Sequence, residues 1–320
     1  MHQDSRIFVA GHRGLVGSAI LRRLGEQGYA NLVTRSRAEL DLTDQTAVRA
    51  FFDREGIEYV FLAAAKVGGI LANERMGADF IRDNLLIQTN VIDAAWRAGV
   101  KKLLFLGSSC LYPKFAEQPL REEALLTGEM EQSNKPYAIA KIAGITMCQA
   151  YQRQYGFNAI SAMPSNLYGP GDNFDPEGSH ALPGLIRRFY DAKMAGAPSV
   201  TMWGTGTPRR EFLYVDDMAD ACLHLMLHYD APEIVNVGPG TDISIAELAD
   251  MIRRIVGYEG KLEHDLTKPD GHPRKVMEVS RLFATGWRPK VELEEGVRRT
   301  HAWFLEHVAP TIASAKQAAE

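Results

Sequence analysis

Short apolar runs rich in strand-forming residues alternate with helix-period segments through the first half of this 320-residue chain. Strands that are apolar on both sides must be covered on both faces, so runs of this kind separated by helices favour a parallel sheet between two helical layers. We therefore predict an α/β protein with a Rossmann-type, doubly wound parallel sheet. The expected strands span residues 7–10, 32–34, 59–62, 103–106 and 159–163, and the expected helices span 16–27, 43–54, 78–97 and 137–155.

The second half of the chain changes character after a turn-rich stretch at residues 168–178. We interpret this stretch as a loop over a functional site, because Gly, Pro, Asn and Asp are concentrated in it. A chain of this length commonly forms about two domains. We therefore place one domain at residues 1–170 and a smaller α/β lobe at 171–320, with some segments of the lobe returning to the first sheet. The lobe's expected strands are 199–203, 234–237 and 261–264, its expected helices are 182–193, 217–227, 245–256 and 293–306, and residues 313–320 are expected to form an irregular tail.

Charge and cysteine content exclude several classes of partner. The 36 basic and 40 acidic side chains give a formal net charge of -4, so no global positive field attracts nucleic acid or an anionic membrane. Cys110, Cys148 and Cys222 are an odd number without metal-ligand spacing, which argues against a disulfide framework and against a metal site. We see no signal peptide or membrane span in the sequence and expect a cytoplasmic protein.

Three glycines at a three-residue spacing directly follow the first expected strand. Gly11, Gly14 and Gly17 can provide a tight turn, a close backbone approach and close helix packing, and Leu15 and Val16 between them are also assigned to the cofactor. The free N–H groups and the dipole of a helix N-terminus favour an anion, so a dinucleotide pyrophosphate would bind here. Such glycines can also form a simple turn, but their place between a strand and a helix favours the nucleotide site.

The residues after the second expected strand indicate which dinucleotide binds. NAD-preferring folds usually carry an acidic residue there for the ribose 2′-hydroxyl, whereas this chain has Arg35, Ser36 and Arg37. Arginine suits a 2′-phosphate, and Arg13 in the glycine loop would add a second cation, so we predict NADP(H). The alternative is that these arginines are ordinary solvated side chains. Asp41, just downstream, would either cap the next segment or meet the adenine amino group.

A tyrosine and a lysine four residues apart are the first candidates for chemistry. Tyr137 and Lys141 fall on one face of an expected helix, about one turn apart. A lysine ammonium beside a phenol lowers the phenol's pKa from its ordinary value of about 10 and prepares it for proton transfer. Ser108 follows the fourth expected strand, at the edge where open α/β sheets bind ligands, and would meet the same substrate oxygen. The tyrosine–lysine spacing alone is common by chance.

Together these motifs resemble the extended short-chain dehydrogenase/reductase family. The glycine loop, Ser108, the Tyr137–Lys141 pair and the run from Pro164 to Pro170 all match, so the similarity extends over nearly the whole chain. The resemblance implies that Tyr137 donates or accepts a proton, that Lys141 binds the nicotinamide ribose, and that Ser108 hydrogen-bonds the substrate oxygen. It also implies that the cofactor contacts Arg37, Asp41, Pro164, Asn166, Leu167 and His180.

Within this family the chain is similar to the branch that acts on GDP-4-keto-6-deoxy-D-mannose. Family dehydratases carry a Thr-Asp-Glu triplet where this chain has Ser109, Cys110 and Leu111, so the carboxylates needed for water elimination are missing. The similar branch epimerises C3 and C5 and then reduces the C4 ketone with NADPH, giving GDP-L-fucose. The resemblance assigns Cys110 as the base and His180 as the acid of the epimerisation. The alternatives are a buried small apolar side chain for Cys110 and a helix-start residue for His180.

The second half of the chain offers residues that suit a nucleotide sugar, which needs arginines for two phosphates, an aromatic surface and polar anchors. Without the resemblance, a solvated arginine and a core tryptophan are equally good interpretations. Arg209 and Arg210 are adjacent, so the sequence leaves open which of the two faces the phosphates. The resemblance maps substrate binding onto Asn166, Arg188, Trp203, Arg210 and Asp270.

The resemblance also implies an assembly of two copies. Members of the family pair through the helices that correspond to residues 78–97 and 137–155, forming a four-helix bundle between subunits. We therefore expect a homodimer. The sequence does not divide apolar residues such as Ile142, Ile145 and Met147 between the internal sheet and this interface.

Two other functions stay open on the sequence. An NAD-dependent nucleotide-sugar C4 epimerase of the same fold would recycle a bound cofactor, and Arg35, Arg37 and Cys110 argue against it. A non-catalytic NADP-binding regulator would not need the Tyr137–Lys141 pair together with its serine. We therefore favour turnover, although a fold by itself never establishes an activity.

Overall fold

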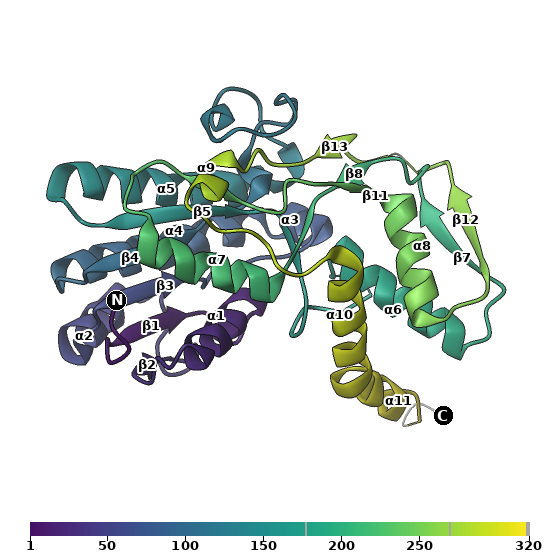
Figure 1. The fold of residues 1–320 in the computed structure, drawn as a ribbon, viewed down its shortest axis with the longest axis horizontal. Helices are drawn as coiled ribbons and strands as arrows, with labels where there is room; N and C mark the ends of the chain where they lie inside the picture. The colour runs from purple at the N-terminus through teal and green to yellow at the C-terminus, as the bar shows by residue number, and fades with distance from the viewer. Residues whose placement is uncertain (177, 269, 318–320) are drawn as a thin grey trace.

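Parallel strands form the central sheet of the computed structural model, which describes residues 1–176, 178–268 and 270–317. The sheet contains β1 (Ile7–Ala10), β2 (Leu32–Val33), β3 (Tyr59–Leu62), β4 (Lys102–Leu106), β5 (Ala159–Pro164) and β10 (Val235–Val237). The strand order is β10-β5-β4-β3-β1-β2, and every neighbouring pair is parallel (Figure 1). The order reverses beside β1, and the ligands of such sheets bind outside the carboxyl ends of the strands near this point.

Helices cover both faces of this sheet. α1 (Leu15–Glu26) and α7 (Val215–His228) lie on one face, and α2 (Gln45–Glu55), α4 (Gly77–Arg97) and α5 (Lys135–Tyr155) lie on the other. Phe8 of β1 belongs to the core shared with α2, α4 and α5, whereas its neighbour Val9 belongs to the core shared with α1 and α7. Alternate residues of the strand therefore point to opposite layers, and the predicted doubly wound α/β sheet is confirmed.

A smaller lobe lies beside the sheet (Figure 1). Its strand pairs are β6 (Asn166–Tyr168) with β9 (Phe212–Tyr214) and β7 (Ser199–Trp203) with β12 (Lys261–Asp265), and β8 (Arg209–Arg210) lies between β11 (Ile243–Ser244) and β13 (Arg274–Lys275). Its helices are α6 (Ala181–Met194), α8 (Ile245–Val256), α10 (Leu293–His307) and α11 (Ala309–Gln317). Side chains such as Phe189, Leu248 and Phe304 form its separate apolar core.

Segments of the second half return to the first sheet. β10 pairs with β5 at the sheet edge, and α7 packs against α1. The chain therefore crosses between sheet and lobe several times, and it leaves the sheet at the carboxyl ends of β5 and β10, which lie side by side. The short elements α3 (Ile70–Arg75) and α9 (Ser280–Ala284), and turns of 3-10 helix at Ser109–Leu111, Glu122–Ala124 and Gln132–Asn134, connect these parts.

The end of the chain differs from the sequence-based expectation. We predict an irregular tail from residue 313, but α11 continues to Gln317, so this prediction is wrong for the described part of the tail. Val308 and Ile312 pack against the core of the lobe, and this burial holds the segment in place. Residues 318–320 lie outside the described residues.

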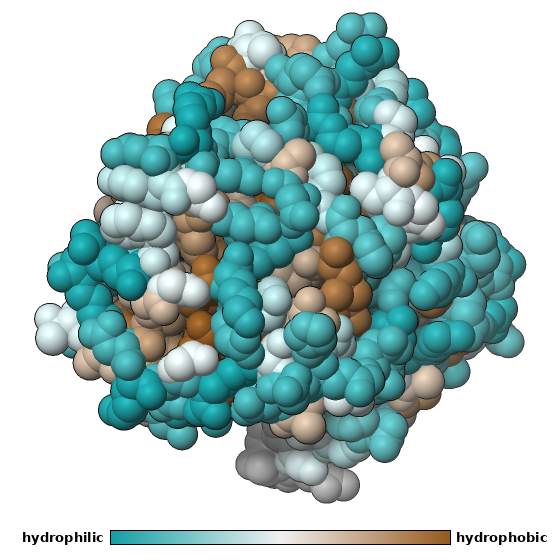
Figure 2. Space-filling view, turned by 60° about the vertical axis from the view of Figure 1, so that its left-hand side comes forward, coloured by the Kyte–Doolittle hydropathy of each residue, from teal (hydrophilic) through white to brown (hydrophobic). Residues whose placement is uncertain are grey.

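The surface is mainly hydrophilic on the face that Figure 2 shows, with apolar residues gathered in separate patches. Among the described residues, the structure contains no helix with the length and apolar character that a membrane crossing requires.

Candidate active site

The glycine loop between β1 and α1 is shaped for close approach to the backbone. Gly11 has a φ of +85°, and a Cβ built on it would lie 2.7 Å from a backbone nitrogen of the segment after β3. A Cβ on Gly17 would lie 2.1 Å from the carbonyl oxygen of Gly11. Gly14 is the N-cap of α1 and supplies no side chain to it, so the first N–H groups of this helix remain available to an anion. Leu15 and Val16 pack partly against the core below.

The arginines near the loop differ in how they are held. Arg35 donates to Glu55 at 2.7 Å and to a backbone carbonyl, so it serves the local structure. Arg37 is largely exposed and lies 3.7 Å from Asp41, and Arg13 is exposed and pairs with no described residue. Arg13 and Arg37, rather than Arg35, are therefore the cations available to a 2′-phosphate. Asp41 accepts hydrogen bonds from the N–H and hydroxyl two residues further on, at 2.9 and 2.8 Å, and so stabilises the turn before α2, whose N-cap is Asp44.

The residues of the catalytic hypothesis meet at the carboxyl end of β4. Ser108 follows this strand and accepts a hydrogen bond from the backbone N–H of Cys110 at 3.2 Å. Tyr137, in the first turn of α5, hydrogen-bonds Ser108, and its ring packs edge-on against Phe80. A serine hydroxyl and a thiol from the segment after β4 therefore lie close to a phenol from α5.

The protonation of Tyr137 differs from the expectation. Burial raises the pKa of the Tyr137 phenol, the charge of Cys110 raises it further, and the hydrogen bond to Ser108 opposes the rise only in part. The prediction that Lys141 lowers this pKa is therefore wrong for the protein alone, because the loss of solvent around the phenol dominates. Tyr137 is accordingly a neutral hydrogen-bond donor, ready to give a proton to a substrate oxygen.

Lys141 is a buried lysine whose amine has no hydrogen-bond acceptor among the described residues. Its side chain is 3% exposed, its Nζ lies 4.1 Å from the centre of the Phe105 ring, and no described residue accepts a hydrogen bond from it. Burial lowers its pKa to about 7, and nearby Cys148 opposes this change. A buried donor without an acceptor suits a ligand that brings hydroxyl groups, such as a ribose.

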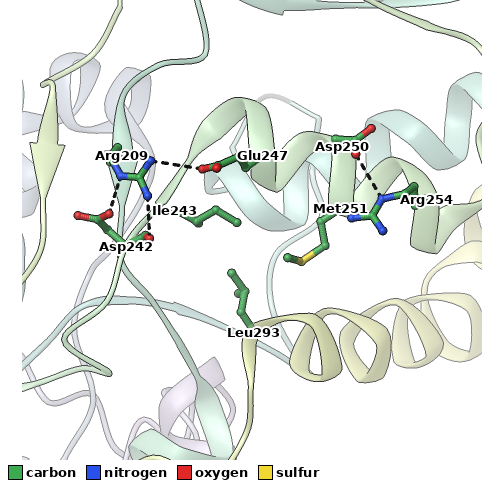
Figure 3. A pocket seen from close by; sticks show the side chains of 8 residues that line it. All are labelled: Arg209, Asp242, Ile243, Glu247, Asp250, Met251, Arg254 and Leu293. Carbon is green, nitrogen blue, oxygen red and sulfur yellow. Dashed lines mark hydrogen bonds and ion pairs between the residues drawn. The ribbon is translucent and has the colours of Figure 1, made fainter.

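The two adjacent arginines of β8 point to different places. Arg209 donates to Asp242 at 2.6 Å and to Glu247 at 3.4 Å, and these residues line a cavity of about 430 Å³ on the far side of the strand (Figure 3). Arg210 is half-buried, and Cys110 lies close enough to raise its pKa, although the loss of solvent lowers it overall. Successive side chains of a strand alternate in direction, so Arg210 faces the Cys110 cluster and Arg209 faces away.

Residues at the end of β5 and in β6 border the same site. Pro164 ends β5 and is buried, and Leu167 packs partly against the core beside α1. Asn166 donates from its amide to the carbonyl oxygen of Glu211 at 2.7 Å, which leaves the oxygen of its own amide free to accept. The sequence reasoning missed Glu211, whose side chain is 1% exposed. The sequence offers one signal for Glu211, which is a charged residue placed directly before the apolar residues of β9.

His180 stands at the N-cap position of α6 with its side chain exposed. The surrounding protein atoms remove enough solvent to lower the pKa of its imidazole. The loop before it is close to the segment after β3, since a Cβ on Gly69 would lie 3.6 Å from the carbonyl oxygen of Gly178. Among the described residues, no hydrogen bond or ion pair joins His180 to the cluster of Ser108, Cys110 and Tyr137.

The residues assigned to the outer part of a substrate lie on the lobe surface. Arg188 donates to the carbonyl oxygen of Thr201 at 3.4 Å and is otherwise exposed, and Trp203 is 70% exposed. Asp270 accepts from the N–H and the hydroxyl of Thr205 at 2.9 and 2.7 Å, so its carboxylate already stabilises a turn of the lobe. The core alternative for Trp203 is therefore wrong, and Asp270 keeps only part of its acceptor capacity for a ligand.

The other cysteines are structural. Cys148 and Cys222 are fully buried in helices α5 and α7, as the interpretation of them as core residues requires. Within the part of the chain that the structure describes, no group of three or more His, Cys, Asp and Glu side chains is placed to hold a metal ion.

A glycine loop beside the switch point and a buried Tyr–Lys pair at the sheet edge define a dinucleotide-dependent enzyme of the doubly wound class. The chain matches the model of the NAD dependent epimerase/dehydratase family over residues 7–238, and it belongs to that family.

Two relatives and a solved structure give closer comparisons. The chain is 60% identical to GDP-L-fucose synthase 1 of Arabidopsis thaliana over 306 residues, covering 96% of this chain and 95% of the relative. It is 53% identical to GDP-L-fucose synthase of Escherichia coli (strain K12) over 311 residues, covering 94% and 97%. The crystal structure of a GDP-L-fucose synthetase from Naegleria fowleri bound to NADP matches with a TM-score of 0.87 at 30% identity, covering 96% and 95%.

Proposed function

We propose that this chain converts GDP-4-keto-6-deoxy-D-mannose into GDP-L-fucose, by epimerisation at C3 and C5 followed by NADPH-dependent reduction of the C4 ketone. One observation carries the proposal most strongly. Ser108, Cys110 and Tyr137 form a single cluster, with Arg210 directed toward it from the lobe. The high identity to GDP-L-fucose synthases over nearly the whole chain supports this substrate rather than another nucleotide sugar.

The residues present fit NADP(H), and the solved relative with NADP bound supports this cofactor. The backbone around Gly11 and Gly17 leaves no room for a Cβ, as expected where a pyrophosphate approaches the chain. Arg13 and Arg37 would hold the 2′-phosphate, and the unsatisfied amine of Lys141 would bind the nicotinamide ribose. When bound, NADPH supplies the hydride for C4. We assign residues 1–170 to this cofactor and residues 171–320 mainly to the nucleotide sugar.

The cluster explains how one site can perform both kinds of step. The protons on C3 and C5 are acidic because the neighbouring C4 ketone can take up charge as an enolate. Ser108 and Tyr137 would donate hydrogen bonds to the C4 oxygen and stabilise this charge. In the reduction, the same oxygen becomes an alkoxide, and Tyr137, which is neutral in the structure, would give it a proton.

Inversion at each carbon needs a base on one face of the sugar and an acid on the other. We assign Cys110 as the base, because its thiol lies beside Tyr137 and close to the positive charge of Arg210. His180 is the proposed acid, because it stands at the head of α6 with an imidazole that can both give and accept a proton. Residues 109–111 hold no carboxylate, which disfavours a dehydratase.

The lobe would hold the GDP moiety. Arg188 and Arg210 would pair with the two phosphates, Trp203 would offer an apolar face, and Asn166 and Asp270 would bond sugar hydroxyls. Because Arg209 is occupied by Asp242 and Glu247, we assign the phosphate role to Arg210.

We also propose that two copies pair through α4 and α5. These helices pack side by side, and Leu86 of α4 and Ile139 of α5 are each 40% exposed. A four-helix interface between two copies would cover these two apolar side chains. Sedimentation should give a dimer at micromolar concentration. A monomer at all accessible concentrations would contradict the assembly without affecting the catalytic assignment.

The activity is tested with purified protein, GDP-4-keto-6-deoxy-D-mannose and NADPH in deuterated water. We expect NADPH oxidation together with deuterium at C3 and C5 of the product, located by NMR. Oxidation without deuterium would identify a simple C4 ketoreductase instead. Neither signal with this sugar, together with conversion of another nucleotide sugar into its C4 epimer, would favour the recycling C4 epimerase. No reaction with any nucleotide sugar would favour a binding protein.

A further inference from the structure

Glu211 connects segments from four parts of the chain at the junction of sheet and lobe. One carboxylate oxygen accepts from the N–H of Gly240 at 2.7 Å and the other from the N–H of Met277 at 2.8 Å. Its backbone carbonyl accepts from the amide of Asn166 at 2.7 Å, and its backbone N–H donates to the carbonyl oxygen of Lys275 at 3.2 Å. One residue therefore links β6, the β8–β9 junction, the turn after β10 and the segment after β13.

This junction surrounds groups that the proposed function uses. Asn166 is held directly by the backbone of Glu211. Arg210 precedes Glu211, and its guanidinium donates to the carbonyl oxygen of His272 at 2.6 Å. His272 lies just before the segment that the Glu211 carboxylate fixes through Met277. The position of the Arg210 guanidinium therefore depends on the register that this carboxylate maintains between β8 and β13.

The structure is built around a carboxylate at this position. Two buried N–H donors need two acceptors, which a carboxylate provides and an amide does not. A Cβ at residue 238 would lie 2.2 Å from the Glu211 side chain, so Gly238 makes the space that the carboxylate occupies.

We propose that Glu211 is a positioning residue, which holds Arg210 and Asn166 in the arrangement that binds the diphosphate and the hexose of the substrate. This inference rests on the proposed function. It concerns substrate binding and leaves the chemical groups at Ser108, Cys110 and Tyr137 in place.

Glu211→Gln tests the proposal, since it keeps the size of the side chain and replaces one acceptor with a donor. We expect the KM for the GDP sugar to rise at least tenfold, with kcat reduced less than threefold and the Kd for NADPH within twofold of the wild type. Asp217→Ala is the control for loss of a buried carboxylate, because one oxygen of Asp217 accepts from the backbone N–H groups of Lys290 and Val291, away from this site. The control should lower Tm by a similar amount and leave the KM unchanged.

Two results would overturn the proposal. The first is a lowered Tm in Glu211→Gln with a KM within twofold of the wild type, since this would show that Glu211 only stabilises the fold. The second is an equal rise in KM for both variants. If Glu211→Gln does not fold, Glu211→Asp replaces it, and a KM raised several-fold is then expected. Calorimetric titration with GDP separates the positioning role from the proposed function, because it does not depend on turnover. A tenfold weaker affinity for GDP in the Glu211 variant supports the positioning role even if the wild type does not turn over the proposed sugar. Equal affinities of variant and wild type contradict it.

Discussion

Two of the groups assigned to chemistry and two of the groups assigned to the outer part of the substrate are built in opposite ways. Tyr137 and Lys141 are fixed by a helix that packs on the central sheet, and the lysine is almost fully buried. Arg188 and Trp203 sit on the surface of the lobe with few or weak protein partners. The comparison indicates that the reacting geometry is set before substrate arrives, whereas the outer contacts gain most of their definition from the ligand.

The largest effect is expected at the preformed cluster. Tyr137→Phe removes the proposed proton donor and leaves the ring packing against Phe80 intact. We expect kcat for NADPH oxidation to fall by roughly a thousandfold, since a positioned general acid contributes about 10²–10⁴-fold. Stopped-flow absorbance at 340 nm measures this, with NADPH affinity as the control. A fall of less than about tenfold would show that another group supplies the proton.

The cofactor loop should be nearly as sensitive, because its backbone is closely packed. In Gly17→Ala the new Cβ would meet the carbonyl oxygen of Gly11, so the loop must shift, and we expect NADPH to bind at least tenfold more weakly. Gly25→Ala in the same helix is the control, since a Cβ there meets nothing within 4 Å. It should preserve NADPH affinity and stabilise the protein by up to about 1 kcal/mol. Fluorescence titration compares the two, and equal affinities would refute the close-approach argument.

Lys141 gives a test through stability rather than rate. Its pKa is about 7 in the folded protein and near its ordinary value, about 10.4, when unfolded. Between these values the unfolded chain binds more protons, so this residue makes the free energy of unfolding rise with pH. Without cofactor, Lys141→Met should therefore have a higher Tm than the wild type at pH 7, and this advantage should shrink by pH 10. A difference in Tm that stays constant across this range would contradict the buried, unpaired amine.

The smallest effect is expected at the exposed residues assigned to the outer part of the substrate. Trp203→Ala removes an exposed ring, and we expect the KM for the GDP sugar to rise about three- to tenfold with kcat unchanged. Tyr155→Ala, at the far end of α5, is the control for loss of an exposed aromatic side chain and should leave the KM unchanged. A hundredfold loss of kcat at Trp203 would place this residue among the preformed groups.

The same contrast explains what the sequence could predict. The five strands of the first half and their helices show clear periodicity, and the pairing of Tyr137 with Lys141 follows from helix geometry alone. β10 has three residues and β8 has two, so neither shows a pattern that identifies its neighbours.

Long-range contacts set the rest of the site. The sequence does not show that Arg210 faces Cys110 while Arg209 is held by Asp242, because these contacts join residues about 30 to 100 positions apart. It also does not reveal that Arg35 is occupied by Glu55, or that burial raises the pKa of Tyr137. These outcomes depend on packing and solvent exclusion, which appear only once the chain is folded.

The central claim is that one cluster performs epimerisation and reduction with separable groups. Cys110→Ser tests it most directly, in deuterated water with GDP-4-keto-6-deoxy-D-mannose and NADPH. The account predicts that deuterium uptake at C3 and C5 falls at least a hundredfold while NADPH oxidation continues, giving a C4-reduced sugar that is not epimerised. Deuterium uptake equal to that of the wild type would show that Cys110 is not the base and would contradict the assignment of the two steps to separable groups of one cluster.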